Sequence, residues 1–419
     1  MSSPFSVIDL FSGAGGLSEG FCNNSYQFIA HVEKNAYASD TLETRMIYHA
    51  IKKNNSSVYY DYLKGTLSRE ELKQYFIDNY DVPSLILREE ITRTNRWDLI
   101  NTIKRKSYDD ASPVDVIIGG PPCQAYSMIG RGRLPEKMQS DPRNYLFKHY
   151  LTFLKVFQPK MFVFENVPGI TSAKKGEIFQ NLQNSFASNG YVCEARILNA
   201  ADFGVLQERK RIIIIGWKNE YDIQYPDFMK DGRADECIND LFIDLPKLKA
   251  GEGKIPMVKE YLTPPTKYLK NSGIRTDKDI LIQHEARFHN ERDLEIYRLA
   301  VDKWETGEIR IKYNELPEHL ITHNNRASFL DRFKVVNGKG HSHSIVSHLG
   351  KDGHYFIHPD IKQNRSLTVR EAARIQSFPD NYKFEGCRQS HYMQIGNAVP
   401  PLMSIEIAKK LNEKLSIIS

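Results

Sequence analysis

One stretch constrains this chain more than any other: an apolar segment at 114–118 that runs directly into a turn of two glycines, two prolines and Cys123. The segment is short and rich in β-branched side chains, which indicates a buried strand. Glycines and prolines cannot continue it as strand or helix, so a rigid turn holds Cys123 at the carboxyl end of the strand. Ligands and catalytic groups gather at this edge of open α/β sheets. The pattern therefore favours a functional cysteine over a small buried hydrophobic side chain.

The amino-terminal segment has the opening of a nucleotide-binding α/β fold. An apolar strand at 7–11 enters the glycine-rich turn 12–16, and apolar residues then continue with helical spacing. Glycines let a ligand approach the backbone closely, and a helix N-terminus favours negative charge. The second strand, 28–32, ends at Glu33, where an acid commonly hydrogen-bonds the ribose hydroxyls of an adenosine-containing ligand. A solvated glutamate at a strand end is the alternative.

Two further strands bring polar groups to the same edge. The strand 161–164 ends in Glu165, and burial there would raise the carboxyl pKa so that Glu165 could hold or donate a proton near neutral pH. The buried run 212–215 follows Arg209 and Arg211, which alternation places on one side, toward the crevice. Guanidinium groups there would lower the pKa of a cysteine thiol, ordinarily about 8.5, and bind a carbonyl oxygen. They supply the positive surroundings that a cysteine nucleophile requires.

Two segments lie outside this framework. Residues 51–85 are interpreted as an insertion that forms a surface helical elaboration without chemistry of its own. The basic segment 128–137 places glycine hinges beside Cys123 and predicts a lid that closes on a substrate, with Arg131 and Arg133 suited to phosphates. An exposed loop with incidental charge is the alternative.

Apolar periodicity predicts further helices at 36–50, 98–106, 145–156, 284–300 and 404–415. From 217 to 363 the pattern changes to short segments with many turns and mixed charge. The stretches 342–348 and 354–358 are expected to pair as strands across a glycine-containing turn. The histidines of this region lack the Cys or Asp pattern of a metal site, which favours phosphate contacts instead: His341, His343, His348, His354 and His358.

Composition narrows the class of protein. A chain of 419 residues exceeds one ordinary core, so two domains are expected. Apolar runs are too short to span a bilayer and the first residues open no secretory signal, so we expect a cytoplasmic protein without a membrane. Five cysteines without a CxxC pair fit a reducing compartment. A net charge of +5 permits an anionic partner without demanding one.

Six motifs occur in the order typical of the DNA cytosine-5 methyltransferases, and the chain strongly resembles that family, in its prokaryotic restriction–modification type. The match covers nearly the whole chain outside roughly 51–85 and 220–360. Any one motif could arise by chance, whereas six in order could not. They are Asp-Leu-Phe-Ser-Gly-Ala-Gly-Gly at 9–16, Pro-Pro-Cys-Gln at 121–124, Glu-Asn-Val at 165–167, Gln-x-Arg-x-Arg at 207–211, the block 365–379, and Gln-Ile-Gly-Asn-Ala-Val-Pro-Pro at 394–401.

The resemblance implies a Rossmann-like S-adenosylmethionine-dependent methyltransferase domain, with a mostly parallel sheet and helices on both faces, and a smaller, loop-rich target-recognition domain. The catalytic and cofactor-binding domain would span 1–217 and be completed by 390–419. The target-recognition domain would span 218–363. The segment 364–389 would be the hinge, with structural roles for Arg365 and Glu371.

The resemblance also implies a cofactor, S-adenosyl-L-methionine, and the side chains around it. Phe11 would lie against the adenine, Glu33 would hold the ribose, and Asn397 would return to the amino-acid end of the cofactor. Glu90 stands where the family usually has aspartate before isoleucine and would approach the adenine amino group. The full set of implied cofactor residues is Phe11, Gly13, Gly15, Glu33, Glu90, Leu146 and Asn397.

The implied reaction transfers a methyl group to carbon 5 of cytosine in double-stranded DNA. Cys123 would add to carbon 6, because carbon 5 alone is a poor nucleophile. Glu165 would protonate or hydrogen-bond ring nitrogen 3, Arg211 would hold the carbonyl oxygen, and Arg209 would lie near the thiolate. The chemistry needs no metal, and the base must be flipped out of the duplex. The expected DNA contacts are Gln124, Ser127, Arg131 and Arg133.

Other functions fit the sequence less well. A tRNA cytosine methyltransferase shares the motifs, but that branch has little in place of the long region 217–363. A nicotinamide-dependent oxidoreductase would explain the glycine turn and Glu33 and leave the Glu-Asn-Val-Pro-Gly and Gln-x-Arg-x-Arg motifs unexplained. A catalytically inactive DNA-binding module is disfavoured because nucleophile, acid and arginines are all present. The expected partners are double-stranded DNA and a cognate restriction endonuclease or defence-system proteins.

Overall fold

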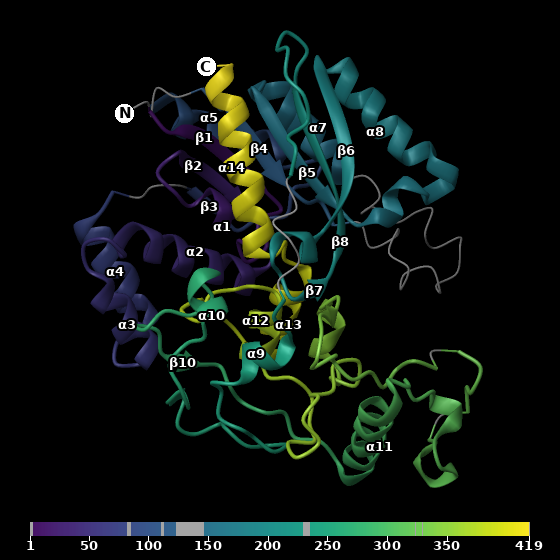
Figure 1. Ribbon diagram of the computed structural model, residues 1–419. Coiled ribbons are helices and arrows are strands. Elements are labelled where there is room, and N and C mark those ends of the chain that lie inside the picture. The colour runs from purple at the N-terminus through teal and green to yellow at the C-terminus, as the bar shows by residue number, and fades with distance from the viewer. Residues whose placement is uncertain are drawn as a thin grey trace.

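A seven-stranded sheet organises the amino-terminal half of the chain (Figure 1). The computed structural model describes residues 3–81, 85–109, 113–122, 146–228, 235–322, 324–328 and 330–418. The expected lid and the side chains at its base lie outside the described residues, among them Cys123, Gln124, Ser127, Arg131 and Arg133.

The strands follow the order β3-β2-β1-β4-β5-β8-β6 across the sheet. The first five of these are parallel, and β8 runs antiparallel to both of its neighbours. This mostly parallel sheet confirms the predicted α/β class. The strands are β1 (Phe5–Leu10), β2 (Tyr26–Val32), β3 (Leu85–Leu87), β4 (Val116–Gly119), β5 (Met161–Asn166), β6 (Tyr191–Asn199) and β8 (Lys210–Lys218).

Helices cover both faces of the sheet, because residues along each central strand alternate between two cores. Ile117 of β4 joins the core beneath α5, α7 and α8, whereas Val116 and Ile118 join the core beneath α1, α2 and α14. Four of the predicted helices are confirmed, as α2, α5, α7 and α14. The bounds are α1 (Ser18–Phe21), α2 (Ala36–Ile51), α5 (Arg96–Asp109), α7 (Leu146–Phe157), α8 (Glu177–Ser188) and α14 (Pro401–Ile417).

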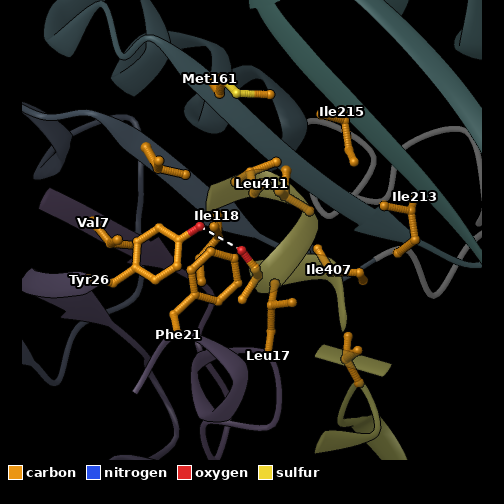
Figure 2. Packing of buried hydrophobic residues seen from close by; sticks show 14 of the residues in the cluster. Val7, Leu17, Phe21, Tyr26, Ile118, Met161, Ile213, Ile215, Ile407 and Leu411 are labelled. Carbon is orange, nitrogen blue, oxygen red and sulfur yellow. Dashed lines mark hydrogen bonds between the residues drawn. The ribbon is translucent and has the colours of Figure 1, made fainter. Parts of the chain in front are cut away.

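The carboxyl-terminal helix α14 completes the amino-terminal fold. Figure 2 shows Ile407 and Leu411 of α14 packed among Phe21 of α1 and residues of the sheet. The Tyr26 hydroxyl donates a hydrogen bond of 2.7 Å to the Ala408 carbonyl, which fixes the helix to β2. The two ends of the chain therefore form one core.

The region after residue 235 has separate cores built from short elements and turns. Among the described residues between 235 and 400, the longest helix is α11, which lies well away from the large sheet (Figure 1). The elements are α9 (Ile238–Phe242), β9 (Val258–Lys259), α10 (Lys267–Asn271), β10 (Leu281–Ile282), α11 (Glu291–Gly307), β11 (Ser342–His343), α12 (Val369–Ile375) and α13 (Arg388–Asn397).

Two expectations for this region are wrong in detail. The helix predicted at 284–300 begins only at Glu291, because the Asn290 side chain caps it by accepting from the Asp293 amide at 2.9 Å. The predicted pairing of 342–348 with 354–358 does not form. Instead β11 pairs in parallel with β7 (Gln207–Glu208), and a short 3-10 helix (Ser347–Gly350) follows.

The insertion forms two helices, α3 (Ser56–Lys64) and α4 (Arg69–Asn79), as predicted. It is more than a surface elaboration, because Tyr59 and Tyr62 are buried in a cluster that includes Ile282 of β10. Among the described helices, none has both the length and the apolar composition needed to cross a membrane.

Candidate active site

The segment 11–16, which follows β1 and contains the glycine-rich turn 12–16, has three residues in the left-handed region. Phe11 has φ +59°, Gly13 +57° and Gly15 +90°. A side chain other than glycine rarely adopts such a φ, so Phe11 is strained in the way that ligand-binding turns often are. A Cβ on Gly15 would lie 2.8 Å from a Leu42 methyl, whereas a Cβ on Gly13 would meet nothing within 4 Å. The open space beside Gly13 leaves room for a ligand to reach the backbone.

Glu33 holds this turn from the end of β2. One carboxylate oxygen accepts from the Gly13 amide at 2.9 Å and the other from the Asn35 amide at 2.7 Å. Burial raises the pKa of Glu33, and these two hydrogen bonds oppose the shift. A carboxylate oxygen can accept two hydrogen bonds, so both oxygens retain a free lone pair for a ligand hydroxyl. The predicted ribose contact fits this arrangement and stays a prediction.

The other predicted cofactor residues surround the turn in different ways. Leu146 is buried at the start of α7, and Asn397 is exposed at the end of α13. The backbone just after Asn397 touches the turn, since a Cβ on Gly16 would lie 2.5 Å from the Val399 carbonyl oxygen. Glu90 is exposed and pairs with Lys34 at 2.8 Å. Its predicted contact with an adenine amino group stays a prediction.

At the end of β5, Glu165 forms an ion pair with Arg211. Arg211 Nε lies 2.9 Å from Glu165 Oε1, and each side chain is 13% exposed. Burial raises the pKa of Glu165, while the positive charges of Arg211 and Arg209 limit the rise. A carboxyl group with a raised pKa can hold or deliver a proton near neutral pH.

Glu165 lies directly against the turn that leads to Cys123. A Cβ on Gly120 would be 2.6 Å from Glu165 Oε2, so only glycine admits the carboxylate there. The next residue, Asn166, donates from Nδ2 to the Pro121 carbonyl at 3.1 Å. The structure thus brings Glu165, Arg211 and the approach to Cys123 together, as the strand-end argument predicts.

Arg209 has a different environment from the one predicted. It is fully buried and donates to the backbone carbonyls of Ile345 at 2.6 Å, Gly396 at 2.9 Å and Ala398 at 2.8 Å. The guanidinium group therefore joins the Gln-x-Arg-x-Arg segment to two distant segments of backbone. A contact with the Cys123 thiolate involves a residue outside the described ranges and stays a prediction. Sequence analysis could not identify these partners, because carbonyl groups carry no sequence signal.

The histidines of the 341–358 stretch turn inward more than predicted. Burial lowers the pKa of both His343 and His358 to about 3, so neither is charged at neutral pH. His343 Nε2 lies 2.8 Å from the Tyr355 carbonyl oxygen, and His354 Nδ1 lies 2.7 Å from the Tyr297 hydroxyl. These internal partners, and the neutral rings of His343 and His358, argue against the predicted phosphate contacts. His348 is exposed.

Comparison with known proteins gives a consistent result. The C-5 cytosine-specific DNA methylase family matches residues 5–64 and 87–413. The type II methyltransferase M.Bpa9945I of Bacillus paralicheniformis is 43% identical, over 98% of this chain and 99% of its own length. The type II methyltransferase M.DdeI of Desulfomicrobium norvegicum is 32% identical, over 97% of this chain and 88% of its own length. The solved structure of a prophage-encoded protein from E. coli, described as a DNA modification methyltransferase, has a similar fold, with a TM-score of 0.66 and 24% sequence identity. The match covers 98% of this chain and 99% of that one.

Proposed function

Since the chain belongs to the C-5 cytosine-specific DNA methylases, we propose that it methylates carbon 5 of one cytosine within a specific duplex sequence, with S-adenosyl-L-methionine as methyl donor. The observation that carries this proposal is the Glu165–Arg211 pair packed against the turn that leads to Cys123. No other feature of the described residues combines a proton-holding carboxyl group with a cation at a strand end beside a cysteine-bearing turn.

The residues around the glycine-rich turn fit the cofactor. The turn has open space beside Gly13 and a carboxylate, Glu33, with lone pairs left for hydroxyl groups. When bound, S-adenosylmethionine supplies an electrophilic methyl group. The residues that we propose hold it are Phe11, Gly13, Gly15, Glu33, Glu90, Leu146 and Asn397.

On the substrate side, the Cys123 thiolate would add to carbon 6 of the cytosine and make carbon 5 nucleophilic. Glu165, whose pKa is raised by burial, would in its protonated form donate a hydrogen bond to ring nitrogen 3 and so favour that addition. Arg211 would orient Glu165 through its Nε and hold the base carbonyl oxygen with the rest of its guanidinium group. After methyl transfer a base removes the proton from carbon 5, and the cysteine leaves.

The DNA would lie between the sheet and the region 218–363, which we propose to be the target-recognition domain, with 364–389 as hinge. The flipped cytosine would be enclosed by the segment containing Gln124, Ser127, Arg131 and Arg133. The curated relatives are type II methyltransferases. A cognate restriction endonuclease or defence proteins as partners, and a location in the cytoplasm with the DNA, follow from that role.

The test is methyl transfer from labelled S-adenosylmethionine to duplex DNA or to tRNA. We expect label in DNA as 5-methylcytosine within one sequence context, and label in tRNA alone would contradict the DNA assignment. Cys123→Ser should abolish transfer while cofactor binding persists; ordinary turnover by that variant would rule out the covalent mechanism. Duplex DNA with 5-fluorocytosine at the methylated position should trap an adduct at Cys123, because its carbon 5 carries no removable proton.

A further inference from the structure

The insertion contains a tyrosine-rich helix whose three tyrosine hydroxyls all bond to residues outside the insertion. On α3, Tyr59 donates to the Asn381 carbonyl at 2.8 Å, and Tyr60 donates to Asp279 Oδ1 at 2.9 Å. Tyr62 donates to the Glu385 carboxylate. Figure 1 shows α3 near β10, and Ile282 of β10 joins the apolar cluster of α3, where the insertion meets the region after residue 235. The helix thus contacts both the proposed target-recognition domain and the proposed hinge.

From Asp279 the hydrogen bonds continue toward the cofactor turn. Asn381 donates from Nδ2 to Asp279 Oδ1 at 2.9 Å, and Arg45 Nη1 donates to Asn381 Oδ1 at 2.8 Å. Arg45 Nε then donates to Glu19 Oε2 at 2.9 Å. Glu19 lies in α1, just beyond the glycine-rich turn, and its amide donates to the Gly15 carbonyl at 2.9 Å. One continuous path therefore joins Tyr60 of the insertion to the turn.

A second contact reaches the turn from the same loop. The Tyr382 hydroxyl donates to the Ala14 carbonyl, and a Cβ on Gly15 would lie 3.0 Å from that hydroxyl. The Arg45 guanidinium lies between two rings, 4.3 Å from the centroid of Tyr48 and 4.6 Å from that of Tyr382. Arg45 is consequently fixed in position by stacking as well as by hydrogen bonds.

The charges in this path are buried and paired. Arg45 is 4% and Glu19 8% exposed at the side chain. Burial raises the pKa of Glu19, but Arg45 and His49 outweigh it and hold that pKa well below its usual range, so the pair stays ionised. Glu19, Cys22 and His49 have ligand atoms within 4.8 Å of one another. Because both Glu19 oxygens bond to Arg45 or His49, this cluster stabilises the fold as an ion pair with hydrogen bonds and is not a metal site.

We propose that Tyr60, Asp279, Asn381 and Arg45 are positioning residues for cofactor binding: they hold Glu19, and through it the glycine-rich turn, in the conformation that accepts S-adenosylmethionine. The path passes through Asp279 of the region that we propose contacts DNA, so hydrogen bonds connect that region to the cofactor turn. The inference rests on the proposed function, because it assumes that the turn binds this cofactor.

The experiment compares Tyr60→Phe with Tyr75→Phe in the full-length protein. Tyr75 is a matched control, since it also lies in the insertion but its hydroxyl accepts from Asn55, within the insertion. The probe is S-adenosylhomocysteine, with its Kd measured by calorimetry. Tyr60→Phe removes one hydrogen bond of the path, and we expect Kd to rise about fivefold, whereas Tyr75→Phe should leave it unchanged.

Turnover on unmethylated bacteriophage DNA supplies the second readout. In Tyr60→Phe, KM for S-adenosylmethionine should rise about fivefold with kcat kept within about twofold, because the reacting groups are untouched. Asn381→Ala removes the middle of the path and should raise KM for S-adenosylmethionine further. If this variant does not fold, the Tyr60→Phe result alone decides whether the inference holds.

Equal Kd values for wild type, Tyr60→Phe and a folded Asn381→Ala would overturn the inference, as would an equal loss in Tyr60→Phe and Tyr75→Phe. Absence of S-adenosylhomocysteine binding by the wild-type protein would instead overturn the proposed function. The two failures are therefore distinguishable.

Discussion

Two buried arginine–glutamate pairs in this chain have opposite electrostatic behaviour. Arg211 contacts Glu165 through one nitrogen, and both side chains are 13% exposed. Arg365 forms two parallel hydrogen bonds of 2.7 Å to Glu371, and these side chains are 0% and 1% exposed. Burial raises the pKa of Glu165 above its usual value, whereas in Glu371 the charge and the hydrogen bonds of Arg365 outweigh burial and lower the pKa well below it.

The difference follows from how many donors each carboxylate has. Glu371 accepts both Arg365 hydrogen bonds and also the Thr368 amide at 2.8 Å, so its ionised form is fully satisfied. Among the described residues, Glu165 has one guanidinium nitrogen in ion-pair contact with it, and burial outweighs the charge of that partner. A carboxyl group that is left partly unsatisfied can exchange a proton with a substrate, whereas a fully satisfied one can only support the structure. The number of donors therefore distinguishes the pair that we propose to be catalytic from the structural one.

The largest effect is expected at Glu165. Glu165→Gln keeps the shape and loses the proton, so methyl transfer should fall about 10²- to 10⁴-fold. Because we propose that this side chain contacts the cytosine and not the cofactor, the urea midpoint and the S-adenosylhomocysteine Kd should stay close to those of the wild type. Single-turnover methylation with labelled donor measures the rate of methyl transfer, and calorimetry measures the S-adenosylhomocysteine Kd. A variant that loses stability but keeps its turnover would reverse the assignment of the two pairs.

The next effect is expected at Glu371. Glu371→Gln leaves Arg365 buried without a counter-charge, which should cost about 3–5 kcal/mol of unfolding free energy. Urea denaturation followed by fluorescence measures this cost. The turnover of the protein that remains folded should match the wild type, because Glu371 braces α12 through its capping box and touches neither proposed ligand. An unchanged urea midpoint would show that the pair is not structural.

Much of this contrast could be predicted from the sequence. Glu165 and Glu33 follow apolar runs, and parallel strands bring their carboxyl ends to one edge, so strand periodicity alone places both acids. Arg365 and Glu371 were assigned structural roles from their motif, and their buried bidentate pair agrees with that.

The partners of Arg209 could not be predicted, because they are backbone carbonyls far away in the sequence. The same holds for β11, which pairs with β7 across the fold instead of with its neighbour in sequence. Local patterns identify which segments are strands and which residues end them. They carry no information on long-range partners among short, weakly patterned segments.

Lowering the pH should reduce the folding stability through the histidines near the Arg365–Glu371 pair before it protonates Glu371 itself. Burial lowers the pKa of His358 to about 3 and of His284 to about 4, against about 6.5 in an unfolded chain. Between pH 6.5 and 5 only the unfolded state takes up these protons, so stability should fall by about 2 kcal/mol per histidine.

Protonation of Glu371 should reduce stability only at lower pH, below about pH 4, because the pKa of Glu371 in the folded protein is lowered from about 4.3. Urea unfolding at pH 7.5, 6 and 5 tests the first window. His358→Asn should give a shallower dependence than the wild type. Stability that increases on acidification would show that these histidines are not buried in the neutral form.

The smallest effect is expected at an exposed pair that extends the comparison. Lys34 and Glu90 lie 2.8 Å apart, as close as the buried pairs, yet are 52% and 53% exposed at the side chain. Water screens such a pair, so Glu90→Gln should change the unfolding free energy by no more than about 0.5 kcal/mol, and added salt should remove even that. Urea denaturation at low and high ionic strength measures it. A cost near that of Glu371→Gln would mean that distance, rather than burial and the number of donors, sets the strength of these pairs.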